Sequence, residues 1–218
     1  MLFRSTLRLA EPDPPEIVIV NPETADGWLE QTAMDGARIR LLHAIGDRDH
    51  AKRFTLWCPY GAKGTPIYVH AKLMIVDDLI VRVGSANLNN RSMGLDSEFD
   101  VFIDCERSGS ENAAPSITAL RHTLLAEHTG QTPAIVADLL EKNGGSMAGM
   151  LDALPKGGKC LRRFEMRALT ETEQAIADSE ALDPEHPEEM MPFYKKRGLF
   201  RSRILRRPKF MTARGEKR

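Results

Sequence analysis

Residues 67–87 read IYVHAKLMIVDDLIVRVGSAN, and this stretch carries most of the information about the fold. Two runs rich in Val, Ile and Leu, residues 67–76 and 79–83, flank the acidic pair Asp77-Asp78. Runs of this composition that are separated by a short polar turn are typical of a β-hairpin. The sequence therefore predicts two antiparallel strands, followed directly by the glycine-containing segment 84–87.

A histidine and a lysine interrupt the first of these runs. His70 and Lys72 are two residues apart, so on a strand their side chains point to the same face, whereas Leu73 points to the other face and into the packing. An imidazole can act as a nucleophile or as a proton carrier near neutral pH. A lysine supplies a cation that suits a phosphate oxygen. We therefore expect His70 and Lys72 to be catalytic residues.

The predicted hairpin returns the chain so that Gly84-Ser85-Ala86-Asn87 arrives beside His70 and Lys72. The hydroxyl, amide and backbone N–H groups of Ser85 and Asn87 can donate hydrogen bonds to a phosphoryl oxygen without adding charge. Because Lys72 and these neutral donors stabilise the negative charge, the predicted chemistry calls for no metal ion and no other cofactor. The spacing thus predicts a site for phosphoryl chemistry.

The full pattern, HxKxxxxD followed by GSxN over residues 70–87, resembles the HKD motif of the phospholipase D superfamily. Six specified residues at fixed spacing match by chance in about 1 in 10⁵ chains of this size or fewer. The continuation NLNNRSMGLDSE, residues 87–98, is similar to that of bacterial phospholipase D and cardiolipin-synthase-like members. The resemblance covers about residues 15–143 and is to the C-terminal half of a two-motif enzyme.

The resemblance implies cleavage of a phosphodiester through a covalent phosphohistidine. One histidine of a pair attacks phosphorus, and the other protonates the leaving alcohol and then activates water or an acceptor alcohol. In two-motif lipases the histidine of the first motif is usually the attacking one, so His70 would serve as the acid and base. The expected substrate is a glycerophospholipid, and Asp77 and Gly84 would have structural roles in the motif.

The resemblance also assigns roles to four further positions. Lys72 and Asn87, with help from Ser85, would hold the phosphoryl oxygens. Glu98 stands where the family places a carboxylate on the far nitrogen of its own histidine, which holds that histidine in one tautomer. A simple surface position stays open for Glu98, as does a purely turn-forming role for Asp77.

The chain contains only one HKD motif, whereas the family builds its site from two. No other histidine is followed by a lysine two residues later; these are His43, His50, His122, His128 and His186. A second motif would therefore come from a second copy in a homodimer, from another chain, or from a missing N-terminal half. Two alternatives stay open: a metal-independent nuclease of the same superfamily, and a non-catalytic half-lobe or fragment. The continuation after Asn87 argues against the nuclease, so a nucleic-acid partner is not expected.

The rest of the chain alternates between strand-like and helix-like patterns, which predicts the α/β class with a mixed sheet flanked by helices. Strands are expected at residues 17–20, 54–57 and 98–104. Helices are expected at about 27–45 and at 116–140, the latter with a break near Gly130 and Pro133. The predicted divisions are an N-terminal segment (1–14), the catalytic half (15–143), and a helical and partly disordered extension (144–218).

The charge distribution and the cysteine content indicate where in the cell the protein acts. The net charge of the 218 residues is −1, yet residues 194–218 hold eleven Lys and Arg against one acid. Residues 195–209 mix these cations with apolar side chains and could lie on an anionic membrane surface, although a solvated basic tail is the alternative. Three cysteines without zinc-site spacing indicate reduced thiols. We therefore expect a cytoplasmic protein, and peripheral contact of residues 195–209 with the inner membrane surface stays open beside the solvated tail.

Overall fold

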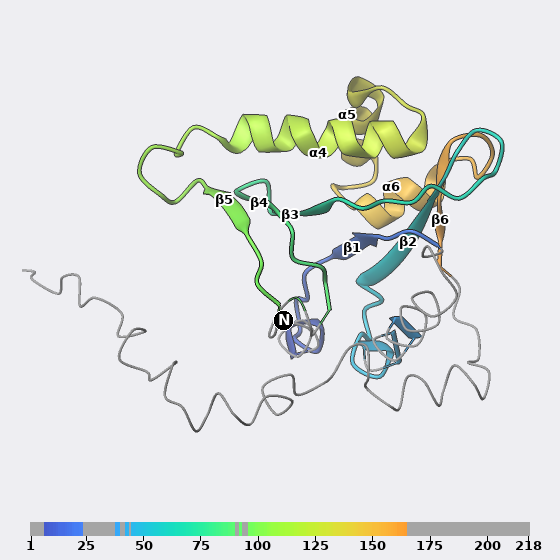
Figure 1. The fold of residues 1–218 in the computed structure, drawn as a ribbon. Helices are drawn as coiled ribbons and strands as arrows, with labels where there is room; N and C mark the ends of the chain where they lie inside the picture. Colours follow the sequence, from blue (N-terminus) through green and yellow to red (C-terminus); the bar gives the residue numbers. More distant parts are fainter. Residues whose placement is uncertain are drawn as a thin grey trace, which may run out of the picture.

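Figure 1 shows the computed structural model, which describes residues 7–23, 38–39, 42–43, 45–89, 92 and 96–164. Its named elements are, in chain order, β1 (Ile17–Val20), β2 (Phe54–Tyr60), β3 (Lys72–Val76), β4 (Ile80–Gly84), β5 (Asp100–Asp104), α4 (Ala114–Thr129), α5 (Pro133–Lys142), α6 (Met147–Ala153) and β6 (Cys160–Arg163). The predicted α/β class is confirmed. The strands form two small sheets, in the orders β1-β2-β6 and β3-β4-β5.

The first sheet has β2 at its centre. β1 runs parallel to β2 over Phe54–Trp57, and β6 runs antiparallel to it over Trp57–Tyr60. Pro59 can therefore lie inside β2, because the ladder with β1 has already ended there and the missing N–H is not needed on that side. As a result β2 extends through Tyr60, three residues beyond the end that the sequence predicted.

The core lies between this sheet and the helices. Trp57 of β2 has no exposed surface and packs in one cluster with Val136 of α5, Met150 of α6 and Leu161 of β6. The predicted C-terminal extension thus supplies one helix and one strand to the core. The acidic and basic segments predicted beyond residue 164 lie outside the described residues.

The two helices predicted around Gly130 are confirmed as α4 and α5. Gly130 ends α4 in the left-handed conformation, with φ of 66°. Thr132 then caps α5 by accepting a hydrogen bond from the N–H of Ile135, and Pro133 occupies the first turn. The helix predicted at 27–45 lies largely outside the described residues, although residues 38–39, 42–43 and 45–46 are helical.

The second sheet is an antiparallel meander that contains the predicted hairpin. Asp77 and Asp78 form its turn with φ of 50° and 56°, a left-handed pair that matches the twist of the flanking strands. The first strand of the hairpin begins at Lys72, whereas the sequence predicted that it begins at residue 67, so the predicted start is wrong. Ile67 instead donates a backbone hydrogen bond to Pro59 at 2.8 Å, and this contact holds the preceding segment against β2.

A bidentate ion pair between Arg121 and Asp78 connects this hairpin to α4. The guanidinium of Arg121 donates to both carboxylate oxygens of Asp78, each at 2.7 Å. The side chains of Asp78 and Arg121 are 22% and 21% exposed. These bonds lower the pKa of the Asp78 carboxyl, with its burial acting in the opposite direction. The turn is therefore anchored to the helix layer, which limits how far the hairpin can move.

Replacing Arg121 by alanine is expected to lower the free energy of unfolding by about 1–2 kcal/mol at pH 7, because a bidentate pair of limited exposure is lost. A carboxyl whose folded pKa is depressed stabilises the fold above its unfolded pKa, about 3.9. The difference between the two proteins should therefore shrink as the pH falls below about 4, toward and through the lowered pKa of the folded Asp78 carboxyl. Urea unfolding of both proteins at pH 7 and pH 3 measures this difference in unfolding free energy.

Arg107→Ala is the matched control. The Arg107 side chain is 82% exposed and reaches Asp104 through a single contact of 3.5 Å. An exposed pair of this kind is worth less than about 0.5 kcal/mol. Equal losses for the two variants would mean that the Arg121 pair does not anchor the turn.

Candidate active site

The hairpin places Lys72 at its open end, directly across from Gly84. The ammonium of Lys72 donates to the carbonyl oxygen of His70 at 2.8 Å, so this cation lies beside the backbone of the histidine. His70 is exposed and precedes β3 by two residues, and its ring stacks on Tyr68 with 5.8 Å between centroids. The structure thus brings His70 and Lys72 together, although a strand does not hold both of them.

Ser85 and Glu98 meet at the same end of the sheet. The hydroxyl of Ser85 donates to a carboxylate oxygen of Glu98 at 2.6 Å and accepts from the N–H of Phe99 at 3.0 Å. The sequence predicted that Ser85 binds phosphate and that Glu98 binds the imidazole of His70. The observed partner of Glu98 is Ser85, a contact that sequence reasoning missed; the two predicted roles stay predictions.

Gly84 is required by a close approach of β5. A Cβ atom at Gly84 would lie 1.9 Å from a carboxylate oxygen of Asp100 and 2.5 Å from the carbonyl oxygen of Phe99. The other oxygen of Asp100 accepts from Arg82 at 2.9 Å, and Arg82 is only 9% exposed. This partly buried ion pair beside the motif was also missed, and the alternation of charged and apolar residues in both strands was its available signal.

Asp77 lies at the opposite end of the hairpin from Lys72. The turn follows Val76, four residues along β3 from Lys72, which is about 13 Å at 3.3 Å per residue. The exposed Asp77 adopts a φ of 50°, and the location is compatible with the structural role that the sequence predicted. Asp77 and the neighbouring Arg121–Asp78 pair therefore lie too far from Lys72 to contact a phosphoryl group held at its ammonium.

The motif residues form an open surface in the described part of the chain. His70, Ser85 and Asn87 are exposed, and Lys72 and Glu98 are half-buried. Leu73 was predicted to pack away from the site, but it is 36% exposed, so that prediction is wrong. Within the described residues, no three His, Cys, Asp or Glu side chains are grouped so that they could hold a metal ion.

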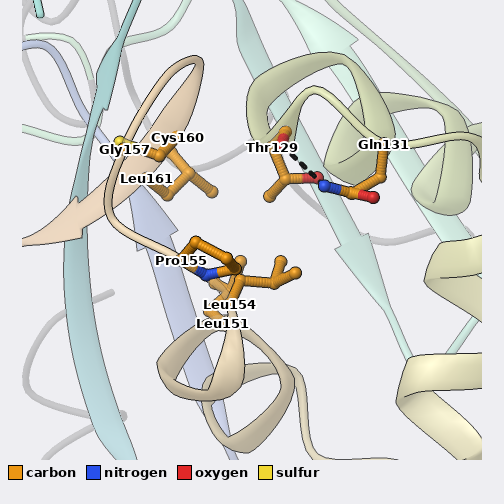
Figure 2. A pocket seen from close by; sticks show the side chains of 8 residues that line it. All are labelled: Thr129, Gln131, Leu151, Leu154, Pro155, Gly157, Cys160 and Leu161. Carbon is orange, nitrogen blue, oxygen red and sulfur yellow. Dashed lines mark hydrogen bonds between the residues drawn. The ribbon is translucent and has the colours of Figure 1, made fainter.

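A small hollow of about 90 Å³ lies on another part of the molecule, and Figure 2 shows the side chains that line it. Its lining comes from the end of α4 and the segment after it, from α6, from the loop that follows α6 and from β6, namely Thr129, Gln131, Leu151, Leu154, Pro155, Gly157, Cys160 and Leu161. None of these residues belongs to the HKD motif. The candidate active site is therefore the open surface around His70 and Lys72. No described helix is long and apolar enough to cross a bilayer.

Comparisons with known proteins identify a family region that includes the HKD motif. A phospholipase D family model matches residues 48–178, which is more than half of the chain and includes α6 and β6. Phospholipase D alpha 4 of Arabidopsis thaliana is 45% identical over 64 residues, which cover 29% of this chain and 8% of that protein. Phospholipase D1 of Schizosaccharomyces pombe is 36% identical over 93 residues, covering 38% of this chain and 6% of that protein.

The matched part is a small fraction of each relative, below a tenth of its length. These relatives come from a plant and a yeast, so the predicted bacterial branch stays a prediction. The family assignment itself rests on the extent of the matching model and on the position of the HKD motif inside it. On these grounds the chain belongs to the phospholipase D family.

Proposed function

We propose that this chain is one lobe of a phospholipase D-type phosphodiesterase or phosphatidyltransferase that acts on glycerophospholipids. The observation that supports the proposal is the position of His70, Lys72 and Ser85 at the open end of one hairpin, with Asn87 three residues beyond Gly84 in the chain, inside the region matched by the family. This grouping offers an imidazole, a cation and neutral donors, which together suit a phosphodiester.

The reaction proceeds by two displacements at phosphorus. In the first, an imidazole nitrogen forms a P–N bond as the P–O bond to the head group breaks, and a second, protonated imidazole gives its proton to the leaving alkoxide. In the second, that imidazole removes a proton from water or an alcohol, whose oxygen attacks phosphorus and breaks the P–N bond. Lys72 and Asn87 stabilise the charge on the phosphoryl oxygens in both transition states.

Two histidines are needed for this sequence of steps, and the chain offers one HKD motif. We propose that a second copy supplies the other, so that His70 of each copy faces the same phosphorus across a two-fold axis. One His70 then acts as the nucleophile and the other as the acid and base. The exposure of His70 supports this arrangement, because its imidazole remains accessible although Tyr68 stacks on one side of the ring.

Location is part of the proposal. A lipid substrate requires contact with a bilayer, and the basic residues 195–209 would bind an anionic surface on the cytoplasmic side. This stretch lies outside the described residues, so the proposal rests on its composition alone.

Transfer to an added alcohol tests the reaction. We expect the full chain, incubated with vesicles of phosphatidylcholine and phosphatidylglycerol and with 1-butanol, to release head group and to form phosphatidylbutanol. A covalent intermediate divides between water and alcohol, so both products should rise from one common precursor. Mass spectrometry of the lipids measures the two products.

Linear DNA serves as the parallel substrate. Cleavage of DNA without any release of head group would favour the nuclease alternative and contradict a lipid substrate. Inactivity on both substrates, for a chain that is dimeric in solution, would contradict the proposed enzyme activity as a whole.

A further inference from the structure

The histidine of the motif lies on a short irregular segment of the chain. β3 begins at Lys72, and the segment before it is attached to β2 by the backbone hydrogen bond from Ile67 to Pro59. Between these two points, residues 68–71 are not assigned to a strand. The ladder of the sheet therefore does not fix the direction of the His70 side chain, and other contacts must do so.

Two side chains hold His70, one from each side of it in the sequence. The ammonium of Lys72 donates to the carbonyl oxygen of His70 at 2.8 Å, which fixes the backbone. The ring of Tyr68 stacks on the imidazole, with 5.8 Å between centroids and 18° between the ring planes. Tyr68 can reach the imidazole because side chains two residues apart lie on the same side of an extended backbone. The backbone and the ring of His70 thus have separate partners.

The geometry of this stack suits an imidazole that must react. Offset-stacked rings are favoured at centroid separations of about 4.5–7 Å, a range that includes the observed pair. Stacking acts on the face of the imidazole, whereas its two nitrogens lie at the edge. Tyr68 therefore restricts the orientation of the ring without occupying either nitrogen. An aromatic face attracts both a neutral and a protonated imidazole, so the contact can persist through both displacements.

The exposure of Tyr68 argues against a role in core packing. Its side chain is 43% exposed, and neither hydrophobic cluster of the described residues includes it. Removal of this ring should therefore leave the core intact. The contact of Tyr68 with His70 is the interaction through which the loss of the ring would be felt.

We propose that Tyr68 is a positioning residue that holds the imidazole of His70 in the orientation needed for attack at phosphorus or for proton transfer. The inference rests on the proposed function. A displacement of about 1 Å at a reacting group can cost about 10²-fold in rate. Lys72 and Asn87 hold the phosphoryl oxygens in the proposed mechanism, so loss of the stack should lower kcat and leave KM unchanged.

The test compares two substitutions in the full-length chain. Tyr68→Phe keeps the aromatic ring, whereas Tyr68→Leu keeps apolar volume without a ring. The substrate is bis(p-nitrophenyl) phosphate, which is soluble, so contact with a bilayer does not enter KM. We expect Tyr68→Leu to lower kcat about tenfold with KM changed by less than about twofold, and Tyr68→Phe to keep the wild-type kcat within about twofold. Ile135→Ala is the control, because Ile135 in α5 is 44% exposed and should not affect either constant.

The second measurement does not depend on turnover. The imidazole C–H signals of His70 are assigned in proton–carbon NMR spectra by their absence from His70→Ala. The ring current of an aromatic side chain shifts protons above its face upfield. We expect this shift in the wild-type chain and in Tyr68→Phe, and its loss in Tyr68→Leu.

The outcomes separate the contact from the activity. The inference is overturned by a Tyr68→Leu protein whose kcat or whose imidazole signals match those of the wild-type chain. A Tyr68→Phe protein as slow as Tyr68→Leu would show that the hydroxyl acts instead of the ring, and a raised KM with unchanged kcat would make Tyr68 a substrate-binding residue; both overturn it. A wild-type chain without activity contradicts the proposed function, and the spectra alone then support or overturn the contact.

Discussion

Substitution of His70 by alanine is expected to lower the rate of head-group release by at least about 10⁴-fold, because the variant lacks the nucleophile and the proton carrier of both displacements. The fold should not change. His70 is exposed and precedes β3, so its removal leaves no cavity in the core. The thermal midpoint should therefore stay close to that of the wild-type chain.

The measurement is single-turnover head-group release from phosphatidylcholine vesicles, together with thermal unfolding by circular dichroism. His50→Ala is the matched control, because His50 is also an exposed histidine but lies outside the motif. It should retain wild-type activity. Turnover by His70→Ala within tenfold of the wild-type rate would contradict the mechanism, whatever the oligomeric state.

Mixing the two proteins tests whether each site uses two copies of His70. When wild-type chain is refolded with an equal amount of His70→Ala, random pairing places about half of the wild-type chains in mixed dimers. A mixed dimer lacks one of the two histidines, so the activity per wild-type chain should fall by about half. Unchanged activity per wild-type chain would mean that each copy works independently.

The second large effect is expected from Gly84→Ala. The new methyl carbon would lie 1.9 Å from the carboxylate of Asp100 and 2.7 Å from its Cα, so β4 and β5 must separate. Separation also removes the hydrogen bond to Arg82, a side chain that is 9% exposed. Overpacking and a buried charge without its partner together predict a loss of about 3 kcal/mol or more in unfolding free energy.

Urea unfolding of the wild-type and variant chains measures this loss. Gly157→Ala is the control, because a Cβ atom at Gly157 has no other atom within 4 Å. Its unfolding free energy should change by less than about 0.5 kcal/mol. A Gly84→Ala protein that loses less than 1 kcal/mol would show that β5 does not need this close approach. Activity should fall with stability, since Ser85 and Glu98 flank the affected pair.

Elements that depend on neighbouring residues were predicted well. The hairpin follows from two β-rich runs around Asp77-Asp78, and the turn shows the expected geometry. The break between α4 and α5 follows from Gly130 and Pro133, whose backbone preferences act within one turn. Interactions between residues a few positions apart depend only on the local sequence, so a sequence pattern can predict them.

Several contacts between distant residues were not predicted. Arg121 binds Asp78 across 43 positions of the chain, and β6 pairs with β2 about a hundred residues away. Ser85 and Glu98 meet only because β4 and β5 run side by side. Such pairs depend on strand order and register, which local patterns do not specify.

The sequence by itself determined the family, the motif residues and the α/β class. The spacing of the HKD motif and the hydrophobic periodicity are properties of residue order, so they are visible without a structure. The tertiary structure alone decided which atoms meet. It directed Lys72 to the backbone of His70, gave Ser85 the carboxylate of Glu98, and left the row Leu73–Val83–Val101 uncovered beside the motif. The physical reason is that side-chain partners and exposed faces are properties of packing between strands, and packing is set by the whole fold.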